Sequence, residues 1–506
     1  MASTGDDQAL RVDHLQRDLI GRTLRGGALT FGAQGFKVAL QFGTVMILSR
    51  LLPPQVFGLM AMIAALTEAL DQIKDFGLSA ATIQKTEITH EQVTALFWIN
   101  CAIGAAVAVL LFAGSPYIAQ FYGQPELIDV TRWLALAFIL SGATTQHWAL
   151  LRRQMRFRAT ATIDVGSELI GMATAIVAAL AGAGLWALVA QRLAYSASGM
   201  VASWILSGWR PGRPARCTGL KSLLLFGGSM TGNGIINILA RGIDQILIGR
   251  VWGPLPLGLY ERAYKLLMNP INTVTVPLYS VGMPALSRLH QDPERYRRAY
   301  VSLSEKLAMV SVPGAALMMA TPDWIVTLLL GEQWHASAPI LAWLGVAAAL
   351  LPVCFITGLL FVTQDRTPEL LRVGVYSSTI SVVSILIGLP YGPVGVAAGF
   401  ALGTTFLRVP MCFWLAGRRG PVTVGDLCGS IVPSMIAGCI VFAAVFGFRH
   451  LPGLASASPI VGLLLCAALA VVLAFICYAC IPRSRRALQS IRNLPGQILH
   501  GGNASA

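Results

Sequence analysis

Residues 49–59, SRLLPPQVFGL, resemble residues 249–259, GRVWGPLPLGL, at a constant offset of 200 positions. Arg, Pro, Gly and Leu recur at matching places in the two segments. Each segment joins two long apolar stretches, so each is expected to connect the first and second membrane-spanning helix of one half of the chain. Chance similarity of two turns is the alternative, because Pro and Gly favour turns in any protein. The pattern favours an internal repeat.

The composition around these segments is that of a membrane protein. Of the 506 residues, 55% are hydrophobic and 12% are charged, whereas soluble proteins average about 25% charged residues. Only a helix satisfies its own backbone hydrogen bonds in hydrocarbon, and the apolar runs lack the alternation of barrel strands. The sequence therefore predicts an all-α integral membrane protein with about fourteen transmembrane helices. The predicted spans are residues 27–48, 57–78, 92–113, 126–150, 160–182, 184–207, 222–249, 256–287, 300–329, 336–364, 368–389, 392–416, 426–447 and 457–481.

The distribution of Lys and Arg predicts the topology. With the N-terminus placed inside, the cytoplasmic segments hold 24 of these residues, and the outer loops hold three, at Arg50, Arg250 and Arg449. Positive residues concentrate on cytoplasmic loops, so both termini are predicted to be cytoplasmic. The two halves then have the same orientation, and transporters commonly bind substrate between such parallel repeats. These loops and their contacts with anionic lipid account for the net charge of +14, and nucleic-acid binding is not expected.

The predicted architecture is two pseudo-symmetric six-helix lobes followed by two extra C-terminal helices. The parts are a cytoplasmic interfacial segment 1–26, an N-lobe 27–207 with helices 1–6, a cytoplasmic linker 208–221, a C-lobe 222–416 with helices 7–12, two extra helices 426–481, and a basic cytoplasmic tail 482–506. The sequence contains no GxxxxGK[ST] or HExxH motif and no Cys/His metal spacing. No catalytic residue, metal or cofactor is therefore predicted.

Several short motifs carry a resemblance to a known family. They are LLPPQVFGLMAM at 51–62, DFGLSAATIQ at 75–84, LRRQMRFR at 151–158, DQILIGR at 244–250, LGLYERAY at 257–264, PALSR at 284–288 and LGEQW at 330–334. Together they resemble the bacterial lipopolysaccharide and exopolysaccharide flippases of the multidrug/oligosaccharidyl-lipid/polysaccharide exporter superfamily. The resemblance implies 12 to 14 helices, two lobes and alternating access.

The substrate of such a flippase is a sugar chain on an isoprenoid pyrophosphate, which needs a wet cavity with cations inside the membrane. Ionisable residues within spans are costly and usually functional. Lys37 lies mid-way along helix 1, on one helical face with Gln34 and Gln41, and no acid lies three or four residues away. Lys265 lies five residues before Pro270. The family's lipid II flippase relatives carry a substrate-binding basic residue at this place, and the resemblance implies the same role for Lys265.

Further residues complete the predicted cationic cavity, namely Arg262, Arg241 and Arg192. For each of these cations the alternative is a purely structural role, in which an acidic side chain neutralises its charge. Lys37 can pair with an acid on another helix, and Lys265 can pair with Glu261 at i,i+4. Arg241 can pair with Asp244 at i,i+3, and Asp164 or Glu168 of helix 5 can neutralise Arg192. Asp244 and Glu261 are the candidate ion-coupling or charge-neutralising acids.

The sequence thus predicts a flippase that moves an undecaprenyl-pyrophosphate-linked oligosaccharide across the bacterial inner membrane. The expected partners are this lipid-linked substrate, membrane lipid, and a polysaccharide polymerase with its co-polymerase. A polysaccharide polymerase is an alternative identity, but it needs a large outer loop that the spans do not leave. A cation-coupled multidrug antiporter of the same superfamily is another, and it is expected to line its cavity with acids, where this chain is expected to place unpaired cations.

Overall fold

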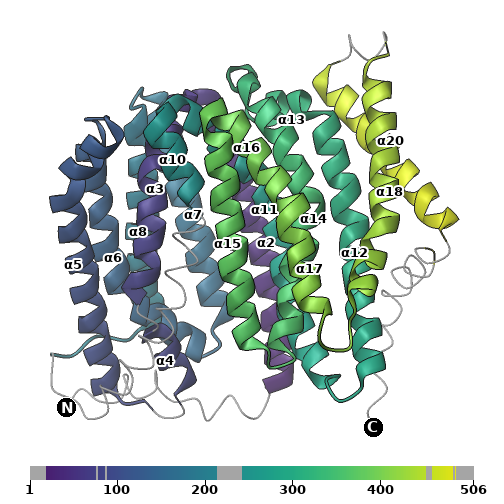
Figure 1. The fold of residues 1–506 in the computed structure, drawn as a ribbon. Helices are drawn as coiled ribbons and strands as arrows, with labels where there is room; N and C mark the ends of the chain where they lie inside the picture. The colour runs from purple at the N-terminus through teal and green to yellow at the C-terminus, as the bar shows by residue number, and fades with distance from the viewer. Residues whose placement is uncertain are drawn as a thin grey trace. The chain divides into compact units, whose positions relative to one another are not determined.

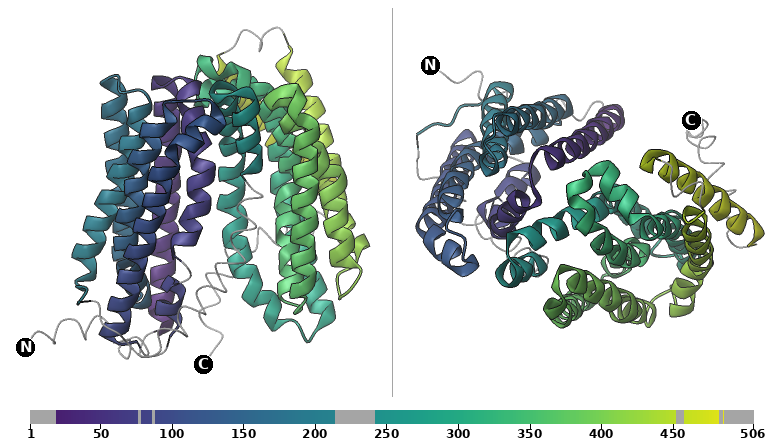
Figure 2. Two further views of the ribbon diagram at one scale, coloured as in Figure 1. Left: turned by 60° about the vertical axis from the view of Figure 1, so that its left-hand side comes forward. Right: turned by 90° about the horizontal axis from the view of Figure 1, so that it is seen from above.

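The computed structural model describes residues 19–75, 78–85, 88–213, 242–451, 458–481 and 485. Within these ranges the regular structure is helical and no strand occurs. The chain divides into two compact units, Met1–Gly258 and Leu259–Ala506. Most helices of each unit run along a common direction (Figure 1) and are seen nearly end-on from above (Figure 2). The all-α membrane fold predicted from the sequence is confirmed.

The first unit contains the helices from α2 to α10 that the structure describes and the first turn of α11. Their bounds are α2 Leu19–Leu51, α3 Pro54–Asp75, α4 Leu78–Gln84, α5 His90–Tyr122, α6 Leu127–Arg153, α7 Phe157–Leu180, α8 Leu185–Ser207 and α10 Ile243–Trp252, and α11 runs from Pro254 to Arg288. Within the unit, α5 packs on α6, α8 packs on both α6 and α7, and α2 packs on α7.

The second unit contains the rest of α11 and the helices that follow it. These are α12 Pro293–Ala320, α13 Pro322–Leu329, α14 Ala338–Val362, α15 Thr367–Gly388, α16 Gly392–Leu402, α17 Val409–Gly417, α18 Val424–Arg449 and α20 Pro459–Cys480. Helix α12 packs between α14 and α18, and α15 packs on α16.

Helices lie at every predicted span within the described residues. Eight helical segments of this part of the chain are long and apolar enough to cross a membrane, and one of them, Thr367–Gly417, contains two predicted spans. Helices α2, α3, α8 and α11 are also 22 to 35 residues long. Each of these helices contains charged residues, which lower its mean hydropathy, and α2, α8 and α11 contain Lys37, Arg192 and Lys265. Of the predicted span 222–249, the structure describes only the part within α10.

The helix ends are specified locally. Helix α5 begins at a capping box, in which the Thr89 side chain accepts from the backbone N–H of Gln92 and the Gln92 side chain accepts from that of Thr89. It ends at Gly123, whose φ of 66° is in the left-handed region that glycine tolerates best. This helix extends to Tyr122, beyond the predicted end at residue 113, because its last two turns remain helical although they are less apolar.

The repeated segments form two equivalent helix starts that cross each other. Helix α3 begins at Pro54 and α11 begins at Pro254, where proline suits the first helical turn. A Cβ atom on Gly58 would lie 1.7 Å from the carbonyl oxygen of Pro254, and one on Gly258 would lie 2.0 Å from that of Pro54. The contact is reciprocal, so the glycine at each matching position permits the close approach of the two helices. This symmetry agrees with an internal repeat.

The two extra helices belong to the second unit. Residues of α18 and α20, among them Val441 and Cys466, form one apolar cluster with Met309 and Ala316 of α12. Ion pairs join α18 to its neighbours at both ends. Arg297 donates to Asp426 at 2.7 Å, and Arg449 donates to Asp323 at 2.7 Å.

Parts of the predicted domain organisation fall outside the described residues. They are most of the interfacial segment 1–26, the linker beyond residue 213, the first part of the C-lobe up to residue 241, and all of the tail 482–506 except residue 485. Helix α10, which the prediction placed in the C-lobe, packs against α3 and α5 and lies in the first unit. The lobe boundaries therefore remain a prediction.

Candidate functional site

The short helix α4 forms one end of a polar region in the first unit. The Arg153 guanidinium donates to the carbonyl oxygen of Thr82 at 2.9 Å and also reaches those of Ile83 and Lys85. These carbonyls at the end of α4 have no partner within the helix, and a cation stabilises them. The Thr82 hydroxyl also donates to the Gln146 side chain at 2.9 Å. These contacts fix α4 against α6 and so position Ser79.

A polar ladder joins α2 to α7. The Lys37 ammonium pairs with the Asp164 carboxylate at 3.1 Å, and the Gln41 amide donates to the Glu168 carboxylate at 3.4 Å. Both pairs are separated by 127 positions, so the two helices are parallel and in a fixed register. Residues four apart share one helical face, which brings both rungs to the same side. The side chains of Lys37 and Asp164 are only 17% and 31% exposed.

A second ion pair joins α8 to α3. The Arg192 guanidinium donates to the Asp71 carboxylate at 2.9 Å. The sequence suggested Asp164 or Glu168 as its partner, but Asp164 pairs with Lys37 instead. The Lys37 ammonium also lies 5.9 Å from the centre of the Tyr195 ring, which is on α8 one turn after Arg192. Charged groups of α2, α3, α7 and α8 therefore meet within one unit.

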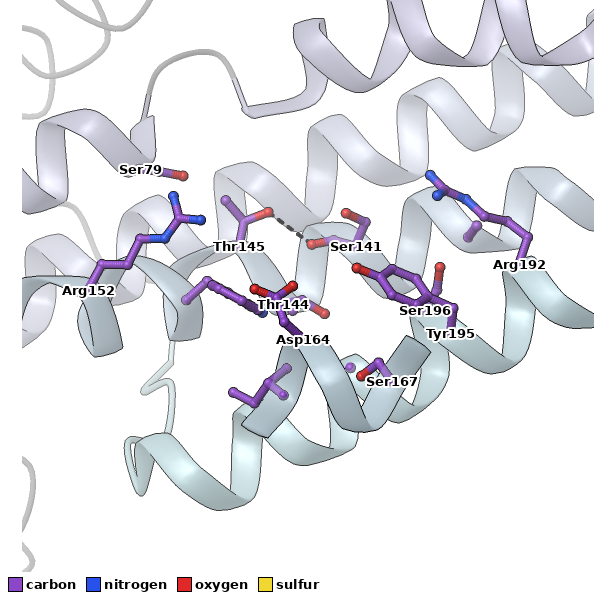
Figure 3. Close-up of a pocket in the computed structure, with 14 residues that line it drawn as sticks. Ser79, Ser141, Thr144, Thr145, Arg152, Asp164, Ser167, Arg192, Tyr195 and Ser196 are labelled. Atoms are coloured by element: carbon purple, nitrogen blue, oxygen red, sulfur yellow. Dashed lines mark hydrogen bonds between the residues drawn. The ribbon is translucent and has the colours of Figure 1, made fainter. Parts of the chain in front are cut away.

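Asp164, Arg192 and Tyr195 border a cavity of about 400 Å³ inside the first unit. Its walls come from α4, α6, α7 and α8, and Figure 3 shows hydroxyl groups and Asp164 between Arg152 and Arg192. The lining residues are Ser79, Ala137, Ser141, Thr144, Thr145, Trp148, Arg152, Ile163, Asp164, Ser167, Arg192, Tyr195, Ser196 and Gly199. Only three of these side chains are purely apolar or absent, which is unusual for the interior of a membrane-spanning unit.

The second unit holds a separate charged cluster at the start of α11. Glu261 lies between two cations, since it pairs with the Lys265 ammonium and its Oε2 lies 3.5 Å from the Arg262 Nε. The side chains of Glu261 and Arg262 are 6% and 10% exposed, whereas that of Lys265 is 44% exposed. Glu261 contacts both cations, and Lys265 is the one whose side chain is exposed to the surroundings.

The structure brings some of the predicted site residues together and separates others. Lys37, Gln41 and Arg192 lie around the polar region of the first unit, and Lys265, Arg262 and Glu261 form the cluster of the second. Gln34 is exposed on α2. Asp244 is 4% exposed, and its carboxylate accepts from the backbone N–H of Gln245 at 2.8 Å, in the first turn of α10. Arg241 lies outside the described residues.

The expectation that the intramembrane cations are unpaired is wrong for Lys37, Arg192 and Lys265. Each has a carboxylate partner, because an isolated charge away from water is costly. The pairs of Lys37 and Arg192 are formed across helices, where local sequence spacing gives no warning. An acidic residue, Asp164, also lines the cavity, so acids and cations are both present there.

Sequence reasoning also missed the lining of the cavity. Trp148, Ser167 and Tyr195 were not singled out, since Ser and aromatic residues occur on most membrane helices. One signal was available. Asp164 and Glu168 are four residues apart on helix 5, as are Lys37 and Gln41 on helix 1, so the two polar faces have matching spacing.

This fold and its internal polar region define a polytopic membrane protein of the transporter type. A family model described as "Polysaccharide biosynthesis protein" matches residues 47–339, more than half of the chain. The chain belongs to this family, which confirms the family resemblance that the motifs indicated.

Curated relatives and a solved structure agree with this assignment. The chain is 28% identical over 342 residues to the teichuronic acid biosynthesis protein TuaB of Bacillus subtilis (strain 168), covering 62% of this chain and 71% of the relative. It is 26% identical over 389 residues to the lipopolysaccharide biosynthesis protein WzxC of Escherichia coli (strain K12), covering 75% of this chain and 78% of the relative. The fold is similar to that of the lipid II flippase MurJ in an inward closed conformation, with a TM-score of 0.69, 12% identity, and coverage of 89% of this chain and 98% of that chain.

Proposed function

We propose that the protein is a flippase that moves an undecaprenyl-pyrophosphate-linked oligosaccharide repeat unit from the inner to the outer leaflet of the bacterial inner membrane. It would act by alternating access, in the assembly of a surface polysaccharide or exopolysaccharide. The observation that carries the proposal is the polar cavity of the first unit, lined by hydroxyl and charged side chains in a helical membrane protein. Such a lining suits a strongly hydrated cargo, because each polar group of the cargo needs a partner once it leaves water.

The relatives support the class of cargo. TuaB and WzxC are named for the biosynthesis of teichuronic acid and lipopolysaccharide, and MurJ is named as a lipid II flippase. A polysaccharide polymerase and its co-polymerase are the proposed partners, since the flipped repeat units must be joined after transport. The described connections on the proposed outer side are short, for example residues 123–126 and 181–184. They leave little room there for the large catalytic loop of a polymerase.

The charged cluster of the second unit is the proposed contact for the pyrophosphate. Lys265 is its exposed cation, and the buried Glu261 is held between Lys265 and Arg262. A compact ammonium group binds phosphate as a point charge and needs no fixed geometry. Lys37 is the candidate substrate-binding cation of the first unit, and there the substrate must compete with Asp164 for it.

A strain that lacks the protein tests this function. It should accumulate the lipid-linked repeat unit in the inner leaflet and export no polymer, and the wild-type protein should restore export. Purified protein in liposomes should make a lipid-linked oligosaccharide accessible to an enzyme on the opposite side. If the deletion strain exports polymer normally and the purified protein does not flip the lipid in liposomes, although protein levels are normal, the proposed flippase function is rejected.

A cation-coupled multidrug antiporter is the second candidate, and the carboxylate of Asp164 in the cavity wall favours it. The fold alone does not separate the two functions, because the superfamily includes both. Binding measured on the purified protein separates them. The flippase should bind an undecaprenyl-pyrophosphate sugar and ignore tetraphenylphosphonium, whereas the antiporter should do the reverse.

A further inference from the structure

We infer that the cavity of the first unit is a sugar-binding subsite that holds a pyranose ring of the cargo directly, apart from the cations proposed for the pyrophosphate. The inference rests on the proposed function and adds to it which part of the cargo this cavity recognises. Seven of its lining residues carry a hydroxyl group. They are Ser79, Ser141, Thr144, Thr145, Ser167, Tyr195 and Ser196.

Two of these hydroxyls are arranged as acceptors. Thr144 donates its proton to the carbonyl oxygen of Leu140 at 2.7 Å, and Thr145 donates to that of Ser141 at 2.9 Å. A hydroxyl that has donated its proton retains two lone pairs. These oxygens, together with the Asp164 carboxylate, therefore match a ligand that is rich in O–H donors. A phosphate at pH 7 has few protons to donate, so a sugar suits these acceptors better.

The Ser167 hydroxyl gives independent evidence for a ligand. Ser167 is only 3% exposed, and its Oγ has no hydrogen-bond partner among the described residues. A buried polar atom without a partner costs about 1–3 kcal/mol, so such atoms usually bind water or a ligand. Ser167 lines the cavity from α7 and faces Gly199 of α8, where a Cβ atom would lie 3.3 Å from Oγ.

Aromatic surface completes the match with a sugar. Trp148 of α6 and Tyr195 of α8 both line the cavity. The C–H groups of a pyranose ring carry a small positive charge, and aromatic faces are electron-rich, so the two attract each other. The Arg152 guanidinium lies 5.2 Å from the centre of the Trp148 ring, which stabilises the ring by a cation–π contact. The volume of about 400 Å³ is within the range of small-molecule sites.

The charges on the Asp164 side of the cavity also favour a sugar over pyrophosphate, whereas Arg152 lies against Trp148 in another part of the lining. Arg192 is paired with Asp71, and Lys37 is paired with Asp164. A pyrophosphate placed in this cavity would lie close to the Asp164 carboxylate and be repelled by it. Sugar hydroxyls would instead donate to the same carboxylate. Sugar recognition is therefore assigned to the Asp164 side of this cavity, and pyrophosphate recognition to the charged cluster of the second unit.

The test measures binding of a lipid-free sugar. The probe is the repeat-unit oligosaccharide released by mild acid from the host's own lipid-linked precursor, titrated into the full-length protein in nanodiscs and followed by saturation-transfer NMR. Wild type should bind it saturably, and Trp148→Leu should weaken binding by about tenfold or more. Trp148→Phe should retain part of the affinity, because it keeps an aromatic face. Undecaprenyl pyrophosphate without sugar should bind Trp148→Leu as it binds wild type.

Matched variants exclude a general loss of structure. Trp133→Leu changes an exposed tryptophan of the same helix, and Thr174→Val removes a half-buried hydroxyl of α7 that is not part of the cavity lining, so neither should alter sugar binding. Ser167→Ala removes an unpartnered buried hydroxyl, so it should keep or raise the melting temperature while it weakens sugar binding. Wild type that binds no free oligosaccharide, or a Trp148→Leu protein that binds it normally, would overturn the subsite. Normal export of the lipid-linked substrate in the same strains would show that the flippase function still holds.

Discussion

At the scale of single residues, the pairing of Lys37 has the largest consequence. The ammonium is mostly buried and lies 3.1 Å from Asp164. Removing one member of such a pair leaves the other without a partner, at a cost between the values for surface and fully buried pairs, about 1–3 kcal/mol. A single substitution of Lys37 therefore changes stability and substrate binding together. Only a second substitution separates the two effects.

The first prediction uses that separation. Lys37→Ala should lower the level of protein in the membrane and abolish polymer export, because Asp164 is left unpaired. The double variant Lys37→Met with Asp164→Asn removes both charges and should restore the protein level but not export. Immunoblots, melting temperatures and polymer yield are the measurements. Arg132→Met is the matched control, since Arg132 is 39% exposed and makes a long 3.8 Å pair with Asp129 and a cation–π contact with Phe112. Wild-type export by the double variant would show that the Lys37 charge does not act on the substrate.

The second prediction concerns Lys265. Its side chain is 44% exposed, and Glu261 keeps Arg262 as a partner when Lys265 is removed. Lys265→Ala should therefore leave the protein level near normal while export is lost. Lys265→Arg should retain part of the export, because charge matters more than fork geometry for a loosely held phosphate. Equal export by wild type and Lys265→Ala would remove this residue from the proposed site.

At the scale of helices, the crossing of α3 with the first turn of α11 depends on the absence of side chains. Gly58 and Gly258 each face the carbonyl oxygen of the proline that begins the other helix. No contact as short as 1.7 or 2.0 Å can be accommodated by a rotamer change, because the opposing atom belongs to the backbone. The helices would have to separate at this point.

The third prediction follows from this crossing. Gly58→Ala and Gly258→Ala should each destabilise the protein by about 1–3 kcal/mol, the usual cost of overpacking. Gly114→Ala in α5 is the control, since a Cβ there has nothing within 4 Å, and alanine favours a helix over glycine by up to about 1 kcal/mol. Melting temperatures of the purified proteins distinguish the cases. Unchanged melting of both crossing variants would contradict the close approach.

The helices were largely predictable from the sequence, because a span must satisfy its own backbone in hydrocarbon and is therefore long and apolar. Helix α14, Ala338–Val362, lies within the predicted span 336–364 for this reason. The partners of the charged residues were not predictable in the same way. The pairing of Lys37 with Asp164 depends on which helices are neighbours, and the partner lies 127 positions away. The cavity-lining serines and threonines resemble those of any membrane helix until the fold brings them together.

At the scale of the whole molecule, topology determines which side the polar groups face. Gln124 and Arg153 lie just before the start and at the end of α6, which has 27 residues. At 1.5 Å per residue these ends are about 40 Å apart, enough to cross a bilayer. The predicted orientation places the end with Arg153 in the cytoplasm, and the cavity wall that includes Arg152 is then near that side.

The fourth prediction tests this orientation. Alkaline phosphatase fused after Arg153 or Arg213 should be inactive, because the enzyme folds only outside the cytoplasm. Fusions after Pro54, Gln124 and Leu255 should be active. The opposite pattern would invert the topology and the side from which the substrate enters. Immunoblots of each fusion show whether the enzyme is present at all.

The fifth prediction concerns the driving force. The cell interior is negative, so outward movement of a pyrophosphate gains about 2.3 kcal/mol per charge per 100 mV. In liposomes at fixed pH without a sodium gradient, a potential set by potassium and valinomycin should therefore drive flipping. The rate should fall when the potential is reversed. Flipping that ignores the potential but follows a pH or sodium step would instead assign Asp244 or Glu261 a role in ion coupling.

The polar ladder between α2 and α7 has one more consequence, which concerns the position of α2 along its axis relative to α7. Its rungs repeat every four residues on both helices, so a slide of α2 by about 6 Å, at 1.5 Å per residue, would bring Lys37 opposite Glu168. The lysine would exchange one carboxylate for another and keep a counterion, so a second register of the two helices would not leave Lys37 unpaired. Gln41 would then face Met172 instead of Glu168. The test uses cadmium bridging between pairs of introduced cysteines, in a background without other cysteines. Bridging of Gln41→Cys with Met172→Cys would show that the shifted register is occupied. Bridging confined to Gln41→Cys with Glu168→Cys would show that only the register of the structure is occupied.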